Sequence, residues 1–175
     1  QNSAEQAPLY RNYFKDSQLL LGPEYALLRP EFSVVGSRRF SNEVQKILVT
    51  LGGSDPSNLG ERVLKDLEPI LKTKKMKLTL LIGAANAHYE SLLQFVGKLN
   101  YPIEIVRQTS EMARFIRDSD LVISAAGSTC WELACLGTPA AVTAVSPNQQ
   151  TMAVLAEKHG FAVNMGDWRA SDPVQ

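Results

Sequence analysis

The stretch that decides the fold is residues 121–150, LVISAAGSTCWELACLGTPAAVTAVSPNQQ. Its first four residues form a short apolar run, which is typical of a strand covered on both faces. A loop of small residues follows, and the pattern then predicts a helix over 129–136 that ends at Gly137, two residues before a proline. Residues 140–145 predict the next strand. The stretch therefore predicts strand, tight loop, helix and strand, the order found in parallel α/β sheets.

The loop between the first strand and the helix has two interpretations. Gly127 and the alanines before it have little bulk, and a helix N-terminus at the carboxyl end of a parallel strand is where α/β folds bind anions and nucleotides. Alternatively, the loop is an ordinary turn in which Ser128 or Thr129 caps the helix and Glu132 completes a capping box. Taken alone, the stretch favours neither interpretation.

Strands and helices alternate through the chain from residue 45 onward. Further strands are expected at 46–51, 77–82, 103–106 and 161–163, and further helices at 59–71, 88–96, 111–118 and 149–158. Pro69 is expected to end the first of these helices, and Ser110 to cap the third. The pattern predicts an α/β, Rossmann-like parallel sheet of about six strands in the order 3-2-1-4-5-6, with helices on both faces.

Residues 1–44 are less regular, and we interpret them as an approach segment that leads to another domain. A short helix is expected within 5–15, with Pro8 in its first turn. An apolar patch for a missing neighbouring domain is expected at Tyr25, Leu27, Leu28 and Phe32. A plain N-terminal extension is the alternative. The chain begins without methionine, and we expect it to be a piece of a longer protein.

Composition narrows the classes of partner. Eighteen basic residues balance eighteen acidic ones, so no basic field is available to attract nucleic acid or an anionic membrane. No apolar run approaches the roughly 20 residues of a membrane span, and no signal peptide is visible. Cys130 and Cys135 are expected on different faces of one helix, which argues against a disulfide and favours the cytoplasm. His88 and His159 are interpreted as structural, and neither a metal nor another cofactor is expected.

A second glycine-bearing loop, at 52–58, follows the strand at 46–51. Gly52 and Gly53 allow close approach of the backbone to a ligand, and Ser54, Asp55 and Ser57 can cap or donate. The loop has neither the dinucleotide pattern GxGxxG nor the Gly-Lys-Ser/Thr of a P-loop. In the expected strand order, this loop and the one at 125–132 open into one crevice at the switch point of the sheet. That coincidence favours a ligand site there.

Polar side chains near that crevice suit the hydroxyl groups of a sugar. Glu132, one turn inside its helix, can accept hydrogen bonds from a ribose diol; its alternative role is to cap the helix and complement its dipole. Asn148 and Gln149 follow the strand at 140–145, and their amides can both donate and accept hydrogen bonds. Their alternative role is to cap the last helix.

Four stretches together resemble one group of nucleotide-sugar enzymes. They are LLLGPEYALLRPEF at 19–32, LVTLGGSDPSN at 48–58, ISAAGSTCWELACLGTPAAV at 123–142 and NQQ at 148–150. The chain resembles the C-terminal half of the UDP-sugar hydrolases of the pseudaminic acid pathway and of the related spore-coat polysaccharide proteins. It resembles more distantly the transferase that forms lipid II. The resemblance implies the GT-B architecture, in which two Rossmann-like domains flank a cleft, with the N-terminal domain missing here.

The resemblance also implies a site for UDP or a UDP-sugar. The implied contacts are Gln108, Thr109 and the backbone up to Met112 for uracil, Gly127, Ser128 and Thr129 for the diphosphate, Glu132 for the ribose, and Gly52, Gly53, Ser54, Asn148 and Gln149 near the phosphates and sugar. The histidine proposed as catalytic in the hydrolases belongs to the missing domain, so no catalytic residue is assigned and the fragment alone is expected to be inactive. A glycosyltransferase with the same donor site, and a binding module without chemistry, stay open.

Overall fold

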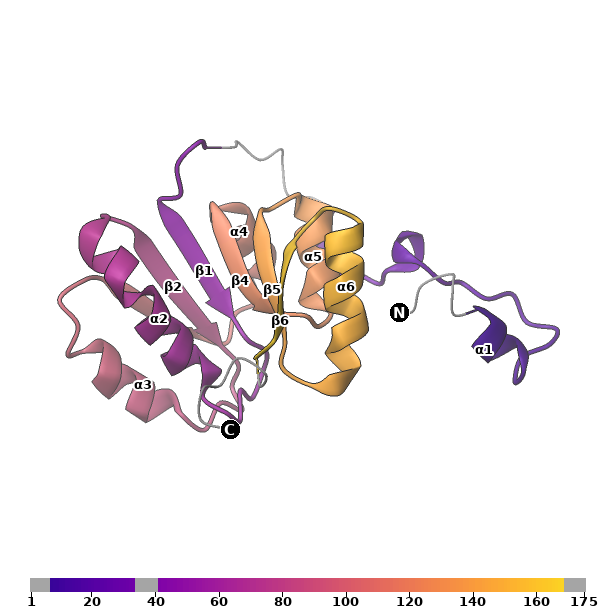
Figure 1. Cartoon of the computed structure of the whole chain (residues 1–175), viewed down its shortest axis with the longest axis horizontal. Helices are drawn as coiled ribbons and strands as arrows, with labels where there is room; N and C mark the ends of the chain where they lie inside the picture. Colours follow the sequence, from indigo (N-terminus) through magenta and orange to yellow (C-terminus); the bar gives the residue numbers. More distant parts are fainter. Residues whose placement is uncertain (1–6, 34–40, 169–175) are drawn as a thin grey trace.

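One parallel sheet organises the computed structural model, which describes residues 7–33 and 41–168 (Figure 1). Within these residues the sheet has the order β3-β2-β1-β4-β5-β6, as predicted. The strands are β1 (Lys46–Thr50), β2 (Lys77–Ile82), β3 (Ile103–Arg107), β4 (Leu121–Ala125), β5 (Ala140–Ala144) and β6 (Val163–Asp167). The chain moves outward from β1 to β3 and then returns to β4 beside β1, so the switch point lies between β1 and β4.

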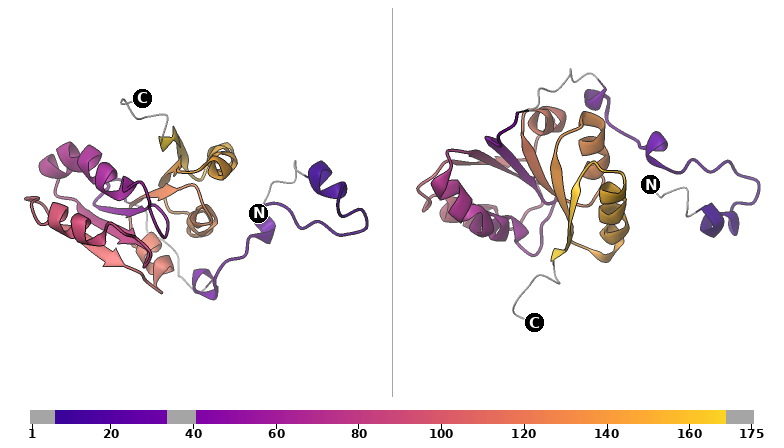
Figure 2. Two further views of the ribbon diagram at one scale, coloured as in Figure 1. Left: turned by 90° about the horizontal axis from the view of Figure 1, so that it is seen from below. Right: turned by 45° about the horizontal axis from the view of Figure 1, so that its top comes forward.

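Helices cover both faces of this sheet, again as predicted (Figure 2). They are α2 (Leu59–Thr73), α3 (Tyr89–Val96), α4 (Met112–Arg117), α5 (Thr129–Leu136) and α6 (Gln150–Lys158). Side chains of α2 and α3 form one apolar cluster with the sheet, and side chains of α4, α5 and α6 form a second cluster on the opposite face. Central strands pack on both sides: Leu48 and Val49 are neighbours in β1 and belong to different clusters.

Two predicted helix ends are wrong. Pro69 does not end α2, which continues to Thr73, because a proline removes only one hydrogen bond and the last turn gains another donor. The Thr73 hydroxyl lies 3.2 Å from the Pro69 carbonyl and 3.0 Å from the Ile70 carbonyl. The helix expected within 5–15 is only α1 (Ala7–Arg11), and residues 1–6 lie outside the described part.

The last strand begins later than the predicted 161–163. The amides of Phe161 and Ala162 donate to the Ala156 carbonyl, and Gly160 has a left-handed φ of 72°. These bonds finish the C-terminus of α6, so the chain cannot yet pair with β5. Phe161 instead packs against Trp131, with ring centroids 6.3 Å apart. His159, as expected, occupies the C-cap of α6.

The approach segment is divided between an exposed part and an anchored part. Figure 1 shows α1 and the chain after it lying away from the sheet. Tyr25 and Leu27 are exposed as expected, but Phe32 is only 3% exposed and Leu28 packs against the same cluster, so the exposed patch predicted around all four is wrong for these two. The short 3-10 helix η3 (Pro30–Phe32) packs on α5, which supplies an apolar surface that the local sequence could not reveal.

In the part of the chain that the structure describes, we find no helix with the length and apolar character needed to cross a membrane.

Candidate functional site

The loops that follow β1, β4 and β5 meet at the carboxyl edge of the sheet. β1 and β4 are hydrogen-bonded neighbours, and β5 lies next to β4. The first loop contains Gly52, whose φ of 95° suits glycine, and Asp55 and Asn58 with φ of 39° and 51°. Two non-glycine residues in left-handed conformation within four positions make this loop unusual, since such strain gathers at functional sites. Because this loop follows β1, which pairs with β4, its residues Gly52, Gly53 and Ser54 lie at the switch point of the sheet, as predicted.

Buried hydrogen bonds hold the first loop in place. Asp55 is 6% exposed, and its two carboxylate oxygens accept from the amides of Leu59 and Gly60 at 2.8 Å each. These amides belong to the first turn of α2, so Asp55 acts as its cap. Of the three side chains that the sequence indicated as able to cap or donate, Ser54, Asp55 and Ser57, it is Asp55 that caps α2.

Two glycines bring the loops after β1 and β2 into direct backbone contact. A Cβ built on Gly83 would lie 2.3 Å from the Gly53 carbonyl oxygen, a separation that real side chains do not reach. A Cβ on Gly53 would meet nothing within 4 Å. Gly83 is therefore required for packing, while Gly53 keeps open space beside it. Local sequence does not distinguish these two roles.

The N-terminus of α5 lies beside these loops and carries no side-chain cap. Ser128 precedes the helix as predicted, but it has helical dihedrals, and within the described residues no side chain caps this end with a hydrogen bond. The cap expected at Ser128 is therefore wrong, while the Thr129 side chain hydrogen-bonds to the Glu132 carboxylate. A Cβ added to Gly127 would lie 3.7 Å from the side-chain nitrogen of Gln149. The loops after β4 and β5 are thus neighbours at the start of α5.

Glu132 has an ion-pair partner that sequence reasoning missed. Its Oε1 accepts a hydrogen bond from Arg29 Nη2 at 3.1 Å, although Arg29 lies 103 positions earlier in the approach segment. The Glu132 side chain is 15% exposed. Burial raises the pKa of this carboxyl, and the Arg29 guanidinium opposes that rise. The aromatic and aliphatic pattern of 19–32 predicts a contact with another domain, and nothing in it indicates the pairing of Arg29 with Glu132.

The amides after β5 are held by local hydrogen bonds. Gln149 Oε1 accepts from the Val145 amide at 3.0 Å, which leaves the Gln149 side-chain nitrogen toward Gly127. Asn148 Oδ1 accepts from the Ser146 hydroxyl at 2.6 Å. Both residues lie in η4 (Pro147–Gln149), immediately before α6. The donors of these two hydrogen bonds are Val145 and Ser146, and neither belongs to the first turn of α6.

The loop after β3 lies at the same edge, two strands away from β1. Gln108 has a left-handed φ of 58°, and its amide donates to the Ile82 carbonyl at 2.8 Å. Thr109, and not Ser110 as predicted, receives the hydrogen bond from the Glu111 amide at 2.9 Å. Met112 begins α4 and packs against the cluster that contains Ala126. Gln108, Thr109 and Met112 thus lie at the same edge of the sheet as the other candidate loops, and α4 packs against α5.

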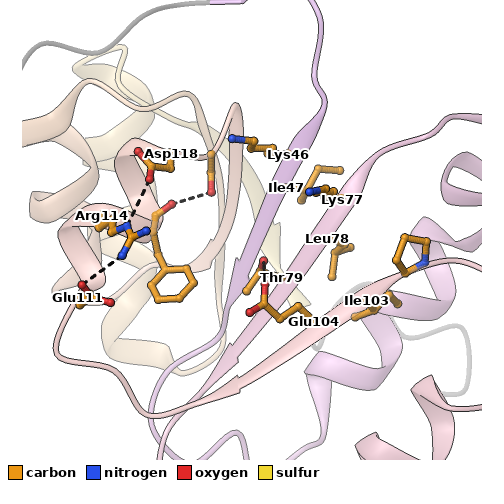
Figure 3. Close-up of a pocket in the computed structure, with 13 residues that line it drawn as sticks. Lys46, Ile47, Lys77, Leu78, Thr79, Ile103, Glu104, Glu111, Arg114 and Asp118 are labelled. Carbon is orange, nitrogen blue, oxygen red and sulfur yellow. Dashed lines mark hydrogen bonds and ion pairs between the residues drawn. The ribbon is translucent and has the colours of Figure 1, made fainter.

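A cavity of about 660 Å³ lies elsewhere, between α4 and β1–β3 (Figure 3). It is lined by Lys46 and Lys77, which are paired in register at the beginnings of β1 and β2, and by Thr79, Glu104 and Phe115. The candidate loops are at the opposite, carboxyl ends of these strands. This cavity and the predicted ligand site are therefore different places in the molecule.

Among the described residues, no group of three or more histidine, cysteine, aspartate or glutamate side chains is placed to hold a metal ion. Cys130 is buried, and burial raises the pKa of its thiol to about 11. Cys135 is exposed on the same helix. The two thiols thus lie in different environments, one buried and one exposed, as expected for different faces of one helix.

The fold and its carboxyl-edge site define a Rossmann-like domain of the GT-B type. The chain belongs to the glycosyltransferase family 28 C-terminal domain family, whose model matches residues 47–169. Among solved structures, the chain is similar to MurG of Acinetobacter baumannii, with a TM-score of 0.59 and 22% identity over 78% of this chain and 42% of that one.

Two curated relatives bear on the wider protein. The spore coat polysaccharide biosynthesis protein SpsG of Bacillus subtilis is 28% identical over 152 residues, or 86% of this chain and 44% of the relative. A Helicobacter pylori protein is 27% identical over 140 residues, or 80% of this chain and 24% of the relative. Its name is pseudaminic acid cytidylyltransferase and UDP-2,4-diacetamido-2,4,6-trideoxy-beta-L-altropyranose hydrolase. The chain spans less than half the length of either relative.

Proposed function

We propose that this domain is the nucleotide-binding half of a nucleotide-sugar enzyme and that it holds UDP or the UDP part of a UDP-sugar. The observation that carries the proposal is the start of α5. It has no side-chain cap, it lies between the loops after β1 and β5, and a largely buried carboxylate, Glu132, lies one turn inside it. A diphosphate supplies the acceptors that such a helix end favours, and a ribose diol supplies donors for the carboxylate.

Each part of the nucleotide sugar is proposed to contact a different loop. The diphosphate binds Gly127, Ser128 and Thr129, the ribose binds Glu132, the uracil binds the backbone at Gln108, Thr109 and Met112, and the phosphates and sugar lie near Gly52, Gly53, Ser54, Asn148 and Gln149. The left-handed backbone of Gln108 supports the uracil assignment, since it turns the chain sharply at the end of β3. The proximity of Gly127 to the Gln149 side chain supports a shared site for phosphate and sugar.

We propose that the longer protein releases UDP from a UDP-linked diacetamido-trideoxy sugar during synthesis of a surface polysaccharide or nonulosonic acid. Water would attack the sugar, and UDP would leave as an anion held by backbone N–H groups at the start of α5. The name of the Helicobacter pylori relative supports a hydrolase of this class. The residues that direct the attacking water would come from the N-terminal domain, which we propose as the partner across the cleft. Free cysteines suit the cytoplasm, where UDP-sugars would be met.

A glycosyltransferase is the second candidate, because the family itself is one of glycosyltransferases. It would use the same donor site and differ only in the nucleophile, a sugar hydroxyl in place of water. A binding module without chemistry is the candidate of another class. Assays of the longer protein on UDP-sugars, with and without acceptor sugars, separate the three: UDP release without acceptor supports the hydrolase, acceptor-dependent release supports the transferase, and no release supports the module.

Binding of UDP is tested on the domain itself by calorimetry with UDP and with ADP. We expect UDP to bind more tightly than ADP. Half of a two-domain site gives a dissociation constant of about millimolar, or some −4 kcal/mol. Equal affinity for the two nucleotides, or no binding of either, would contradict the uridine site.

A further inference from the structure

Arg29 joins two acidic groups from distant parts of the chain. Its Nη2 lies 3.1 Å from Glu132 Oε1 on α5 and 3.1 Å from Glu31 Oε1 in its own segment. The guanidinium also stands 5.3 Å from the centroid of the Phe32 ring. One cation therefore neutralises two carboxylates that would otherwise repel each other. Burial raises the pKa of Glu132, the Arg29 guanidinium lowers it, and the charge of Glu31 raises it.

The segment that carries Arg29 is fixed to the domain on either side of it. Leu28 packs against the apolar cluster of α4, α5 and α6, and Phe32 is part of that cluster. The Phe32 carbonyl faces Cys135 of α5, with the sulfur 3.9 Å away. Because the backbone is anchored at both positions, the guanidinium is presented to Glu132 in a narrow range of positions. Earlier residues of the segment, such as Leu27 at 91% exposed, do not share this anchoring.

The pairing leaves Glu132 able to bind a ligand. A carboxylate has two oxygens and about four sites for hydrogen bonds, and Arg29 uses Oε1. Burial raises the pKa of the Glu132 carboxyl, and the guanidinium opposes that rise; it also limits the rotamers that the side chain can adopt. An ionised, oriented carboxylate is what a pair of ribose hydroxyls requires, since hydrogen bonds to a charged acceptor are the stronger ones.

We propose that Arg29 is a positioning residue that acts through Glu132 and couples nucleotide binding to the docking of residues 28–33 on α5. This inference rests on the proposed function, because it assumes a nucleotide at Glu132. Coupling is reciprocal. If docking of the segment favours UDP, then UDP favours docking of the segment, which leads toward the rest of the protein. The approach segment is then part of the ligand site and reports whether it is occupied.

A double-mutant cycle tests the proposal, with UDP affinity measured by calorimetry for the unchanged chain, Arg29→Gln, Glu132→Gln and the double variant. We expect Arg29→Gln to weaken UDP binding about fivefold to tenfold, a coupling of ordinary size. In the Glu132→Gln background, Arg29→Gln should change affinity by less than about twofold. The matched control is Glu31→Gln, which removes the other carboxylate of the cluster and should leave UDP affinity within about twofold.

Hydrogen exchange supplies a readout that a purely structural role would not change. The amides of Phe32 and Ser33 are hydrogen-bonded within η3, to the carbonyls of Arg29 and Pro30. Saturating UDP should slow their exchange in the unchanged chain and leave it unaltered in Arg29→Gln. Melting temperatures of all variants without UDP show whether each is folded.

The outcomes separate the inference from the proposed function. If the unchanged chain binds UDP and Arg29→Gln binds it equally well, the inference is overturned while the UDP site stands. If Arg29→Gln weakens binding as much with Glu132→Gln as without it, Arg29 acts on the ligand directly, and positioning through Glu132 is overturned. If the unchanged chain binds no UDP, the proposed function and this inference both fail.

Discussion

The charge of Glu132 is needed for the proposed ligand binding, but its burial lowers the stability of the fold. Its carboxylate is largely buried, and burial raises its pKa even though Arg29 lies beside it. A folded pKa above the unfolded one means that the folded protein binds this proton more tightly. The group therefore favours folding when protonated, and that contribution is lost as pH rises through the folded pKa. An ionised Glu132 is a destabilising feature at neutral pH, which is typical of a residue kept for binding.

The substitution Glu132→Gln tests this reading at neutral pH. Glutamine keeps the shape and removes the charge, so UDP binding should weaken by about 1–2 kcal/mol, on the order of tenfold, in calorimetry. The melting temperature without ligand should stay unchanged or rise slightly at pH 7, because the desolvated charge is gone. A control measurement near pH 4 should show a smaller difference. A clear fall in melting temperature at pH 7 with unchanged UDP affinity would assign Glu132 a structural role only.

Asp55 has the opposite character, that of a buried cap. Its two oxygens satisfy two amides of the first turn of α2. Asp55→Ala should lower the free energy of unfolding by about 1–2 kcal/mol in urea titrations, since both amides lose their acceptor. Asp66→Ala, on the exposed face of the same helix, should change it by less than about 0.5 kcal/mol. Equal effects from the two substitutions would contradict the capping role.

Among the elements, the first loop depends on contact with the loop after β2. Gly83→Ala places a methyl group against the Gly53 carbonyl, and a backbone atom cannot move away as a flexible side chain can. We expect a loss of about 1–3 kcal/mol in the free energy of unfolding, as for other overpacked positions. Because the displaced backbone is that of the proposed phosphate loop, UDP affinity should fall as well.

Gly53→Ala is the matched control for that experiment. Its Cβ would meet nothing within 4 Å, so unfolding should change by less than about 1 kcal/mol. Chemical denaturation of both variants measures the comparison. If Gly53→Ala proves as damaging as Gly83→Ala, the close approach of the two loops is not what restricts these positions.

At the scale of the whole molecule, the approach segment has two parts with different duties. Residues 9–27 expose Leu9, Tyr13, Phe14, Leu20, Tyr25 and Leu27. We propose that this series of apolar side chains forms an interaction surface for an N-terminal domain of the longer protein. Residues 28–33 contribute Phe32 to the domain core instead.

Truncation distinguishes these two parts. A chain that begins at residue 28 should keep the melting temperature of the whole chain, because it retains Leu28 and Phe32. A chain that begins at residue 34 should lose about 3–5 kcal/mol of stability, the usual cost of removing a buried phenylalanine. Thermal unfolding of the three chains provides the measurement, and equal stability of the two truncated chains would refute the anchoring of this segment.

The sequence by itself determined the order of elements, the strand order and the edge of the sheet at which the two glycine-bearing loops lie. These follow from local periodicity and from the right-handed connections of parallel strands, which allow few arrangements of six alternating units. Glycines and prolines marked the loops at 52–58 and 126–128 for the same local reason. The end of α2 was misjudged because helical hydrogen bonds and the Thr73 hydroxyl outweigh one proline.

Only the tertiary structure decided which neighbours these residues have. The pairing of Glu132 with Arg29 spans 103 positions, and the contact of Gly83 with Gly53 depends on how two loops approach. Local propensity carries no information about either, because both depend on side-chain packing between elements that are distant in the chain. The same holds for Phe32, whose burial requires the apolar surface of α5, formed more than ninety residues later.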